Sequence, residues 1–386
     1  MRTSYVRRLH ANEIFHAIRR EPRISQRDIV RRTGFDKSTV SSIVARFDEL
    51  GLVLRSAGKA TSRPGRPTEE LSISPRSGLL VGVQVEARDI GFVAAGLDGV
   101  PLAHHREKFD GATTTLAEQV DRGVGKVLAA LTSAVPVLGI GVSLPGLVSS
   151  DGVLVHAPVL GWRDVPVLDM LRPALSAPVS VGNDGKAAAM AEFMFGDCVD
   201  VKDFLYLFTG SGVGGALMLE GAIYGGAMGF AGEFGHIKVV PQGRLCSCGA
   251  LGCLSAYLSE RALVSEVAQA SNHPVAAFDD LLARAEAGDA VVLAALEGAA
   301  GVLGSAVASL INIFNPPVVV LGGDVARAEA YLRPTFERAW RRLAHPSMYA
   351  QSSIHFSTLS AEQPYLGGIA LALDGVTGRG SSSVFP

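Results

Sequence analysis

The chain has 386 residues, 48% of them hydrophobic and 19% charged, so it is long enough for more than one core and too apolar for a disordered protein. The net charge of -2 hides an asymmetry, because residues 1–70 carry 15 basic and 8 acidic side chains and the remainder carries 20 and 29. This distribution excludes a uniformly basic or acidic protein and indicates a polyanionic partner for the N-terminal part only.

Two short amphipathic helices are predicted first. One covers residues 12–19, where apolar side chains recur at three- and four-residue spacing. The other covers residues 26–33. Ser25 is a good N-cap for it, Asp28 follows three residues later as in a capping box, and Gly34 ends it. A further helix follows Gly34, and two helices joined at such a glycine are typical of a helix-turn-helix.

The third predicted helix, residues 37–50, has the pattern of a recognition helix. One face carries Val40, Ile43, Val44, Phe47 and Leu50. The opposite face carries hydroxyls and cations that can reach phosphates and base edges in a major groove. With the first residue of the preceding helix, the predicted DNA contacts are Gln26, Lys37, Ser38, Thr39, Ser42 and Arg46. The alternative for this segment is a solvated helical hairpin without a nucleic-acid partner.

A wing is predicted after the recognition helix. Short strands at 52–55 and 71–73 bracket a loop in which prolines and Gly65 separate Arg63 from Arg66. Such a stiff loop can hold both arginines towards a minor groove, where the negative potential is strong. A proline-rich linker with incidental charge is the alternative. We therefore expect a winged helix-turn-helix over residues 1–75.

The body is predicted to begin as a strand meander. Strands at 81–85, 90–97 and 100–109 are followed by a helix over 114–133 and an apolar strand over 137–142. Asp98-Gly99 forms the turn between the second and third strands. This order fits an actin-like nucleotide-binding architecture, although many α/β folds share it.

Three of the four cysteines fall close together, and they follow a histidine. The set is His236, Cys246, Cys248 and Cys253, whereas Cys198 stands apart. Three thiolates and one imidazole suit Zn²⁺ in a closed structural site, and glycines within the segment allow a tight loop. The sequence therefore predicts one zinc ion per chain, held by the loop 236–253 in a reducing compartment. Buried cysteines beside a core histidine are the alternative.

Three further segments bear on localisation and order. Met1 to Arg8 leads into a polar, arginine-rich helix, so no signal peptide is expected. The apolar stretch 291–314 contains several polar residues and is predicted to be a buried helix, not a membrane span. The expectation is a cytoplasmic protein without a membrane partner. The glycine- and serine-rich tail, 376–386, is predicted to be disordered.

Several motifs together resemble the ROK family of repressors, open reading frames and sugar kinases. They are Leu144–Val148, Ala157–Trp162, Asn183–Asp184, Thr209–Gly215, Glu233–Cys253 and Asn315–Gly323. The resemblance spans residues 10–375, and the N-terminal part is similar to the repressor branch, which includes xylose- and N-acetylglucosamine-responsive regulators. It implies an α/β protein with an actin-like (ribonuclease H-like), two-lobed sugar-kinase fold over 76–375, after the winged helix-turn-helix.

The resemblance also implies a ligand site. At the matching positions, Asn183, Asp184, Glu233 and His236 would contact sugar hydroxyls, and the aspartate is the general base in the kinases. His236 would then present one nitrogen to the metal and the other to the ligand. Two alternatives remain open, because Asn183 or Asp184 can simply cap the following helix and Glu233 can simply orient His236.

The chain departs from the kinase pattern where phosphate would bind. The family's aspartate and Gly-Gly-Thr turn are replaced by Gln84 and by Glu86-Ala87-Arg88. Gln84 lacks the carboxylate that would hold Mg²⁺, and Glu86 would oppose a triphosphate by about 4 kcal/mol per close charge pair before screening. Phosphoryl transfer is therefore not expected, no catalytic residue is assigned, and Asp184 is interpreted as a vestigial base. The second loop, Gly210–Gly215, persists.

The chain also departs from the family pattern at the sugar site. Ser255 replaces a glutamate, Val159 replaces an asparagine, and Lys186 stands where another asparagine is usual. Each lost polar contact is worth about 0.5–1.5 kcal/mol, so the ligand is either bound more weakly or is a different molecule.

These features predict a sequence-specific transcriptional regulator of carbohydrate metabolism. A homodimer or homotetramer would present winged helices to DNA half-sites, and a sugar or sugar phosphate would bind the kinase-like cleft. The alternatives are an active ATP-dependent sugar kinase with a fused DNA-binding domain and a regulator that needs no ligand. The sequence leaves open the effector, the operator and the sign of regulation.

Overall fold

The computed structural model of the chain describes residues 2–57, 69–132, 135–359 and 363–378. The chain divides into two compact units. The first comprises residues 1–144, 166–182 and 365–386, and the second comprises residues 145–165 and 183–364.

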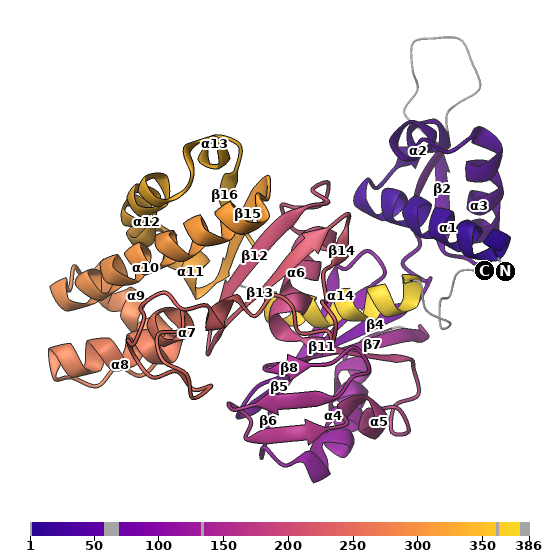
Figure 1. The fold of residues 1–386 in the computed structure, drawn as a ribbon. Helices are drawn as coiled ribbons and strands as arrows, with labels where there is room; N and C mark the ends of the chain where they lie inside the picture. The colour runs from indigo at the N-terminus through magenta and orange to yellow at the C-terminus, as the bar shows by residue number, and fades with distance from the viewer. Residues whose placement is uncertain (1, 58–68, 133–134, 360–362, 379–386) are drawn as a thin grey trace. The chain divides into compact units, whose positions relative to one another are not determined.

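The N-terminal domain of the first unit combines helices with a small antiparallel sheet (Figure 1). Its described elements are α1 (Arg2–Arg20), β1 (Ile24–Ser25), α2 (Gln26–Thr33), α3 (Lys37–Glu49), β2 (Val53–Ala57) and β3 (Glu69–Ile73), with strand order β1-β3-β2. The predicted helices and strands are present, but α1 is much longer than the predicted helix over 12–19. Its first half lacks a regular apolar face, and His10 there packs on Phe35 with ring centroids 4.1 Å apart.

Helix caps fix the start of α2 and of α3. The Ser25 hydroxyl accepts a hydrogen bond from the Asp28 amide at 3.2 Å and donates one to the Asp28 carboxylate at 2.6 Å, as predicted. The cap of α3 was not predicted, and there the Asp36 carboxylate accepts from the Thr39 amide at 2.8 Å. The assignment of Leu50 to the buried face of α3 was wrong. The helix ends at Glu49, and Leu50 is 40% exposed.

The first unit also contains a five-stranded mixed sheet with strand order β11-β7-β4-β5-β6. The strands are β4 (Leu79–Val85), β5 (Asp89–Gly96), β6 (Pro101–Lys108), β7 (Val137–Leu144) and β11 (Val179–Asn183). β4 pairs antiparallel with β5 and parallel with β7. The accompanying helices are α4 (Thr113–Ala129), α5 (Val167–Leu171) and α14 (Gln363–Thr377). The predicted strand meander, helix and further strand are therefore confirmed.

Helix α14 packs unusually close to the sheet because glycines lie on both sides of the contact. A Cβ on Gly141 of β7 would lie 2.0 Å from the Gly368 carbonyl oxygen, and a Cβ on Gly82 of β4 would lie 2.8 Å from the Ile369 amide nitrogen. The helix continues to Thr377, where Val376 and Thr377 are buried. The predicted disordered tail therefore began too early in the sequence, and residues 379–386 lie outside the described residues.

Replacement of Gly141 by alanine is expected to destabilise the first unit by about 1–3 kcal/mol, because the added methyl group must push α14 away from β7. Gly125→Ala is the matched control. Gly125 lies on α4 with nothing within 4 Å of an added Cβ, so alanine there should stabilise the helix by about 0.5–1 kcal/mol. Urea unfolding of the two variants measures the difference. A Gly141→Ala protein as stable as the wild type would contradict the close helix–sheet contact.

The second unit repeats the strand order of the first. Its main sheet has the order β14-β13-β12-β15-β16, with an antiparallel β12–β13 pair and parallel pairs from β12 to β16. The strands are β12 (Phe204–Thr209), β13 (Val213–Leu219), β14 (Ala222–Ile223), β15 (Val318–Gly323) and β16 (Ser353–Phe356). A smaller sheet joins β8 (Leu147–Val148), β9 (Leu154–Ala157) and β10 (Trp162–Val165). In each five-stranded sheet, the first strand is central and its hairpin lies on one side.

The second unit also contains a 3-10 turn and several α-helices. They are α6 (Asp184–Phe195), η1 (Phe234–His236), α7 (Ser255–Leu258), α8 (Glu260–Ser271), α9 (Phe278–Glu286), α10 (Ala290–Phe314), α11 (Asp324–Arg327), α12 (Glu329–Leu343) and α13 (Pro346–Tyr349). Among the described helices, α10 is the one long and apolar enough to cross a membrane, and half of its most apolar window is buried inside the protein. Val292, Leu303 and Ile311 of α10 belong to the core of the unit, so the predicted buried helix is confirmed.

Candidate functional site

The second unit brings the four predicted metal ligands together. The ligand atoms of His236, Cys246, Cys248 and Cys253 all lie within 4.8 Å of one another. The Cys248 and Cys253 sulfur atoms are 3.8 Å apart, and the Cys246 sulfur lies 3.8 Å from His236 Nδ1. A tetrahedral Zn²⁺ with bonds of about 2.3 Å to sulfur requires sulfur–sulfur distances of about 3.8 Å. The donor set and its spacing therefore fit a single four-coordinate metal ion.

Local backbone geometry explains how a short loop gathers these ligands. Isolated bridges join Lys238 to Cys253 and Leu245 to Leu251, so the loop doubles back on itself. Gly252 has φ 74°, and a Cβ there would lie 2.0 Å from the Val240 carbonyl oxygen. Gly249 and Gly252 thus allow two left-handed turns, and Gly252 also allows a close approach that other residues would resist.

Lys238 was not predicted as part of this site. Its ammonium group lies 2.8 Å from the Cys253 sulfur and 3.2 Å from the His236 carbonyl oxygen. Three thiolates around a divalent ion leave one excess negative charge, which a nearby ammonium group offsets. The fourth cysteine, Cys198, lies in a different core, and burial raises its pKa to about 12, which makes it an unreactive thiol.

His236 lies between the cysteine cluster and Glu233. Its Nδ1 faces Cys246, and its Nε2 lies 3.9 Å from a Glu233 carboxylate oxygen. Burial lowers the pKa of His236, which favours the neutral imidazole that a metal requires. Burial raises the pKa of Glu233 to about 7, against the lowering effect of Lys186 and with a further rise from Asp184. The same geometry allows Glu233 to orient His236 and to face a ligand.

Asn183 caps α6, which was one of the two interpretations left open for it. Its side-chain oxygen accepts from the Lys186 amide at 3.0 Å, and its amide donates to the Gly146 carbonyl oxygen at 2.9 Å. The side chain is only 8% exposed. Asp184 accepts from the Gly185 amide at 2.8 Å and from Asn183 at 3.0 Å. Hydrogen bonds within the chain therefore hold both side chains in place.

Two further polar residues join this cluster. Lys186 is half-buried, donates a hydrogen bond to the Gly229 carbonyl oxygen, and lies near enough to Glu233 to lower the pKa of that carboxyl. His156 of β9 lies near enough to His236 to lower its pKa. In the sequence, Lys186 stands out only as a departure from a motif and His156 gives no signal, since tertiary folding alone brings it to the site.

The two substituted sugar-site positions have different environments. Ser255 is buried and donates to the Gly235 carbonyl oxygen at 2.9 Å, so it supports the turn η1 that carries His236. Val159 is 42% exposed and lies in the loop between β9 and β10. Ser255 thus has a structural role here, whereas nothing in the structure explains Val159.

The turn between β4 and β5 has no need of the glycines that the kinases of the family carry there. The Glu86 amide donates to the Asp89 carbonyl oxygen at 2.9 Å, and neither Ala87 nor Arg88 has a positive φ. A side chain at Ala87 is therefore accommodated without strain. Arg106 lies 3.2 Å from the Glu86 carboxylate, which reduces the repulsion expected from Glu86 alone. The Gln84 side chain accepts a hydrogen bond from Ser143 within the sheet.

The second glycine-rich loop connects β12 to β13 and includes the first residues of β13. The Gly210 amide donates to the Gly212 carbonyl oxygen at 2.9 Å, which closes the turn. A Cβ on Gly215 would lie 2.5 Å from the Phe234 ring and 2.8 Å from the Tyr206 carbonyl oxygen. Packing therefore explains Gly215, whereas a Cβ on Gly212 would meet nothing within 4 Å.

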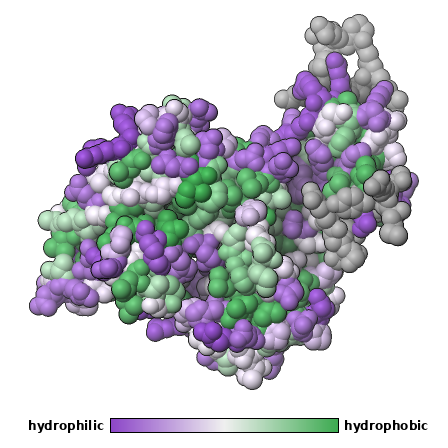
Figure 2. Space-filling model, in the orientation of Figure 1, coloured by the Kyte–Doolittle hydropathy of each residue, from purple (hydrophilic) through white to green (hydrophobic). Residues whose placement is uncertain are grey.

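The predicted DNA contacts lie on α2 and α3 of the N-terminal domain, where hydrophilic side chains are frequent on the visible face (Figure 2). Lys37, Ser38, Ser42 and Arg46 are exposed, and Gln26 and Thr39 are partly exposed. The hydroxyls of Ser38 and Thr39 bond the Asp36 carboxylate, and Arg46 pairs with Glu49 at 2.9 Å. Arg63 and Arg66 of the predicted wing lie outside the described residues.

Comparisons with known proteins cover nearly the whole chain. The ROK family matches residues 80–375, and the MarR family matches residues 13–61. A putative xylose repressor from Caldicellulosiruptor sp. is 29% identical over 91% of this chain and 92% of its own length. A glucokinase from Halalkalibacterium halodurans is 32% identical over 66% of this chain and 81% of its own length. The solved structure of a ROK family transcriptional regulator, a homologue of the E. coli MLC protein, has a TM-score of 0.82 at 23% identity and covers 97% of each chain.

Proposed function

This chain belongs to the ROK family, and on that basis we propose that it is a DNA-binding transcriptional regulator whose kinase-like body responds to a sugar. The observation that carries the proposal is the pairing of a winged helix-turn-helix with this body, matched over nearly the full length of a relative named as a putative xylose repressor. Glucokinases of the family match the body and a smaller share of this chain.

We assign the DNA-binding role to residues 1–75 and the sensing and oligomerising role to residues 76–375. The proposed DNA contacts are Gln26, Lys37, Ser38, Thr39, Ser42 and Arg46, together with Arg63 and Arg66 of the wing. Domains of this kind bind pairs of DNA half-sites as symmetric assemblies, so we propose that the protein is a homodimer or homotetramer. The protein is proposed to act in the cytoplasm, where its operator DNA is found.

We assign zinc to the His236, Cys246, Cys248 and Cys253 cluster, because three thiolates and an imidazole at these spacings match its preferred geometry. The bound ion supplies structural cross-linking of the loop 236–253. Two residues of the chain support this site. The Lys238 ammonium group offsets the thiolate charge, and Ser255 supports the turn that presents His236.

The effector site is proposed to consist of Asn183, Asp184, Glu233 and His236. A sugar hydroxyl beside Asp184 and Glu233 would meet carboxylate acceptors, and His236 would link the ligand to the metal loop. Catalysis is not part of the proposal. Gln84 offers no carboxylate for Mg²⁺, so Asp184 is assigned as a vestigial base that no longer works on a phosphoryl donor.

Phosphoryl transfer separates the proposal from its main rival, an active sugar kinase fused to a DNA-binding domain. With ATP, Mg²⁺ and a panel of hexoses and pentoses, the purified protein is expected to show turnover at least about 10²-fold below that of a ROK glucokinase assayed in parallel. Sugar-dependent turnover at kinase rates would contradict the regulator assignment.

Genomic footprinting of the bound sites tests the regulatory role directly, and calorimetry with the same sugars tests sensing. Operator binding that a sugar weakens or strengthens is the expected result. Operator binding without a heat signal for any sugar would favour the ligand-independent regulator.

A further inference from the structure

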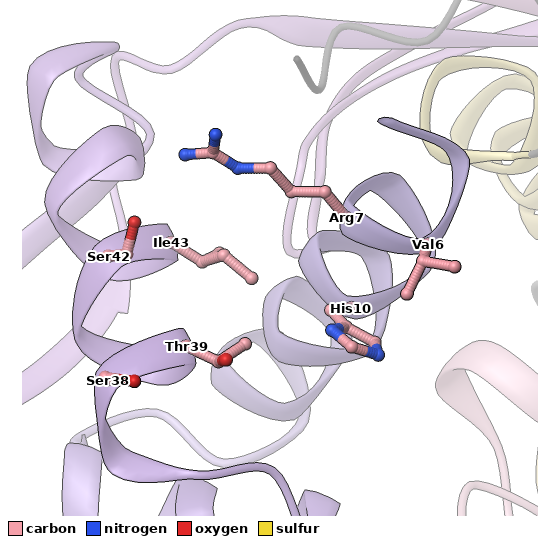
Figure 3. A pocket seen from close by; sticks show the side chains of 7 residues that line it. All are labelled: Val6, Arg7, His10, Ser38, Thr39, Ser42 and Ile43. Carbon is pink, nitrogen blue, oxygen red and sulfur yellow. The ribbon is translucent and has the colours of Figure 1, made fainter. Parts of the chain in front are cut away.

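A groove lies between α1 and α3 of the N-terminal domain. Its volume is about 640 Å³, and its lining residues are Val6, Arg7, His10, Ser38, Thr39, Ser42 and Ile43 (Figure 3). The groove exists because α1 begins near Arg2, well before the helix predicted from the apolar pattern. The early turns of α1 therefore form one wall, and the recognition helix forms the other.

The polar lining of this groove consists of a guanidinium group, an imidazole and three hydroxyls. Two of the hydroxyls, those of Ser38 and Thr39, donate to the Asp36 carboxylate, which leaves Arg7, His10 and Ser42 as the donors for a ligand. Arg7 is exposed, and within the described residues it has no acidic partner. In Figure 3 its guanidinium group extends from α1 towards the Ser42 end of α3. A smaller adjoining pocket is lined by Arg7 and by Arg46, which pairs with Glu49 at 2.9 Å. Guanidinium and hydroxyl groups are donors that phosphate oxygens prefer.

The position of the groove favours DNA over other anions. One wall carries Ser38, Thr39 and Ser42, which belong to the proposed recognition surface of α3. A helix seated in a major groove about 12 Å wide is flanked by phosphates, and an adjacent helix reaches them more readily than it reaches base edges. The neighbouring wall, α1, would then lie against the sugar–phosphate backbone.

We propose that the α1–α3 groove holds a phosphodiester of the DNA backbone and that Arg7 is its principal cation, with His10 as a further donor. The inference rests on the proposed DNA-binding function and adds a contact region that the sequence analysis did not assign. Because phosphates carry no base identity, Arg7 contributes to affinity on every sequence and not to discrimination between sequences.

The test measures binding of the full-length protein to a short duplex of random sequence by fluorescence anisotropy between about 50 and 200 mM salt. Arg7→Gln is expected to weaken binding about 3- to 10-fold at the low end and to reduce the slope of log K against log salt by about 0.9, the value for one phosphate contact. Arg7→Lys should restore the slope, because it restores the charge. Arg172→Gln is the matched control, since Arg172 is an exposed arginine of the first unit that pairs with Asp169.

The outcomes separate this inference from the function on which it rests. A wild-type protein that binds no duplex would overturn the proposed function itself. A wild-type protein that binds, with an Arg7→Gln variant of unchanged slope, would overturn only the α1–α3 groove as a phosphate site. Inorganic phosphate is the second probe. If it binds in the millimolar range and requires Arg7 while duplex binding does not, the groove is a small-anion site and the inference fails.

Discussion

Cys253→Ser is expected to reduce bound zinc from about one ion per chain to nearly none. Cys253 is buried, and its sulfur lies 3.8 Å from that of Cys248 and 2.8 Å from the Lys238 ammonium group. A serine hydroxyl is a poor replacement for a thiolate, and three remaining ligands leave an open site. Elemental analysis of the purified variant measures the loss.

Structural consequences should accompany the loss of metal. Zinc contributes about 10–16 kcal/mol to folding in small zinc-dependent peptides, and the loop 236–253 is made mostly of turns around the ligands. The variant should therefore be cleaved within this loop by a protease that spares the wild type, and any sugar response through His236 should be lost. The wild type after chelation should behave in the same way.

Cys198→Ala is the matched control for this experiment. Cys198 is a buried thiol of the same unit, but it packs in the core beside Phe204 and Met218, away from the other three cysteines. The control should retain about one zinc per chain. Zinc retained in full by Cys253→Ser, or absent from the wild type, would contradict the assignment of the cluster as a zinc site.

Ser42→Glu is expected to weaken DNA binding by at least about 30-fold, or about 2 kcal/mol. Ser42 is exposed on α3 and lines the α1–α3 groove. A carboxylate at this position would face phosphates, and one close pair of like charges costs about 4 kcal/mol at an intermediate dielectric before screening by salt. Glutamate is also a good helix former, so the fold of α3 should be preserved.

Anisotropy titration of an operator found by footprinting measures this effect, and circular dichroism checks that the helix content is unchanged. Ala283→Glu is the matched control, because it adds the same charge to an exposed position of α9 in the second unit. The control should bind as the wild type does. Equal affinities for Ser42→Glu and the control would exclude α3 as the recognition helix.

Local sequence was sufficient to predict features in which the interacting residues lie close together along the chain. Ser25 caps α2 through Asp28, three residues away, and such a bond follows from helix geometry alone. Three of the proposed metal ligands fall within eight positions of one another, so the amino-acid order displays their pattern directly. The family resemblance and the predicted two-part fold are confirmed by the comparisons.

Features that depend on contacts between distant segments of the chain could not be predicted from local sequence. His156 and Lys186 join Glu233 and His236 only after the strands and helices of the second unit have packed. The close contact of α14 with β4 and β7 depends on Gly82 and Gly141, whose partners on α14 lie more than two hundred residues away in the sequence. The length of α1 was also missed, because its early turns are polar and the α1–α3 groove forms from packing, not from periodicity.

The amino-acid order alone therefore determined the kinds of elements, the Ser25 cap of α2, the cluster of histidine and cysteines proposed to hold a metal, and the basic charge of the N-terminal part, since these follow from short-range hydrogen bonding, side-chain spacing and charge. Tertiary structure alone decided which polar groups share an environment. It placed Lys238 against the thiolates, gave Asn183 and Ser255 structural bonds, and paired Glu86 with Arg106. Burial and the proximity of distant charges set these outcomes, and neither is encoded in any single stretch of sequence.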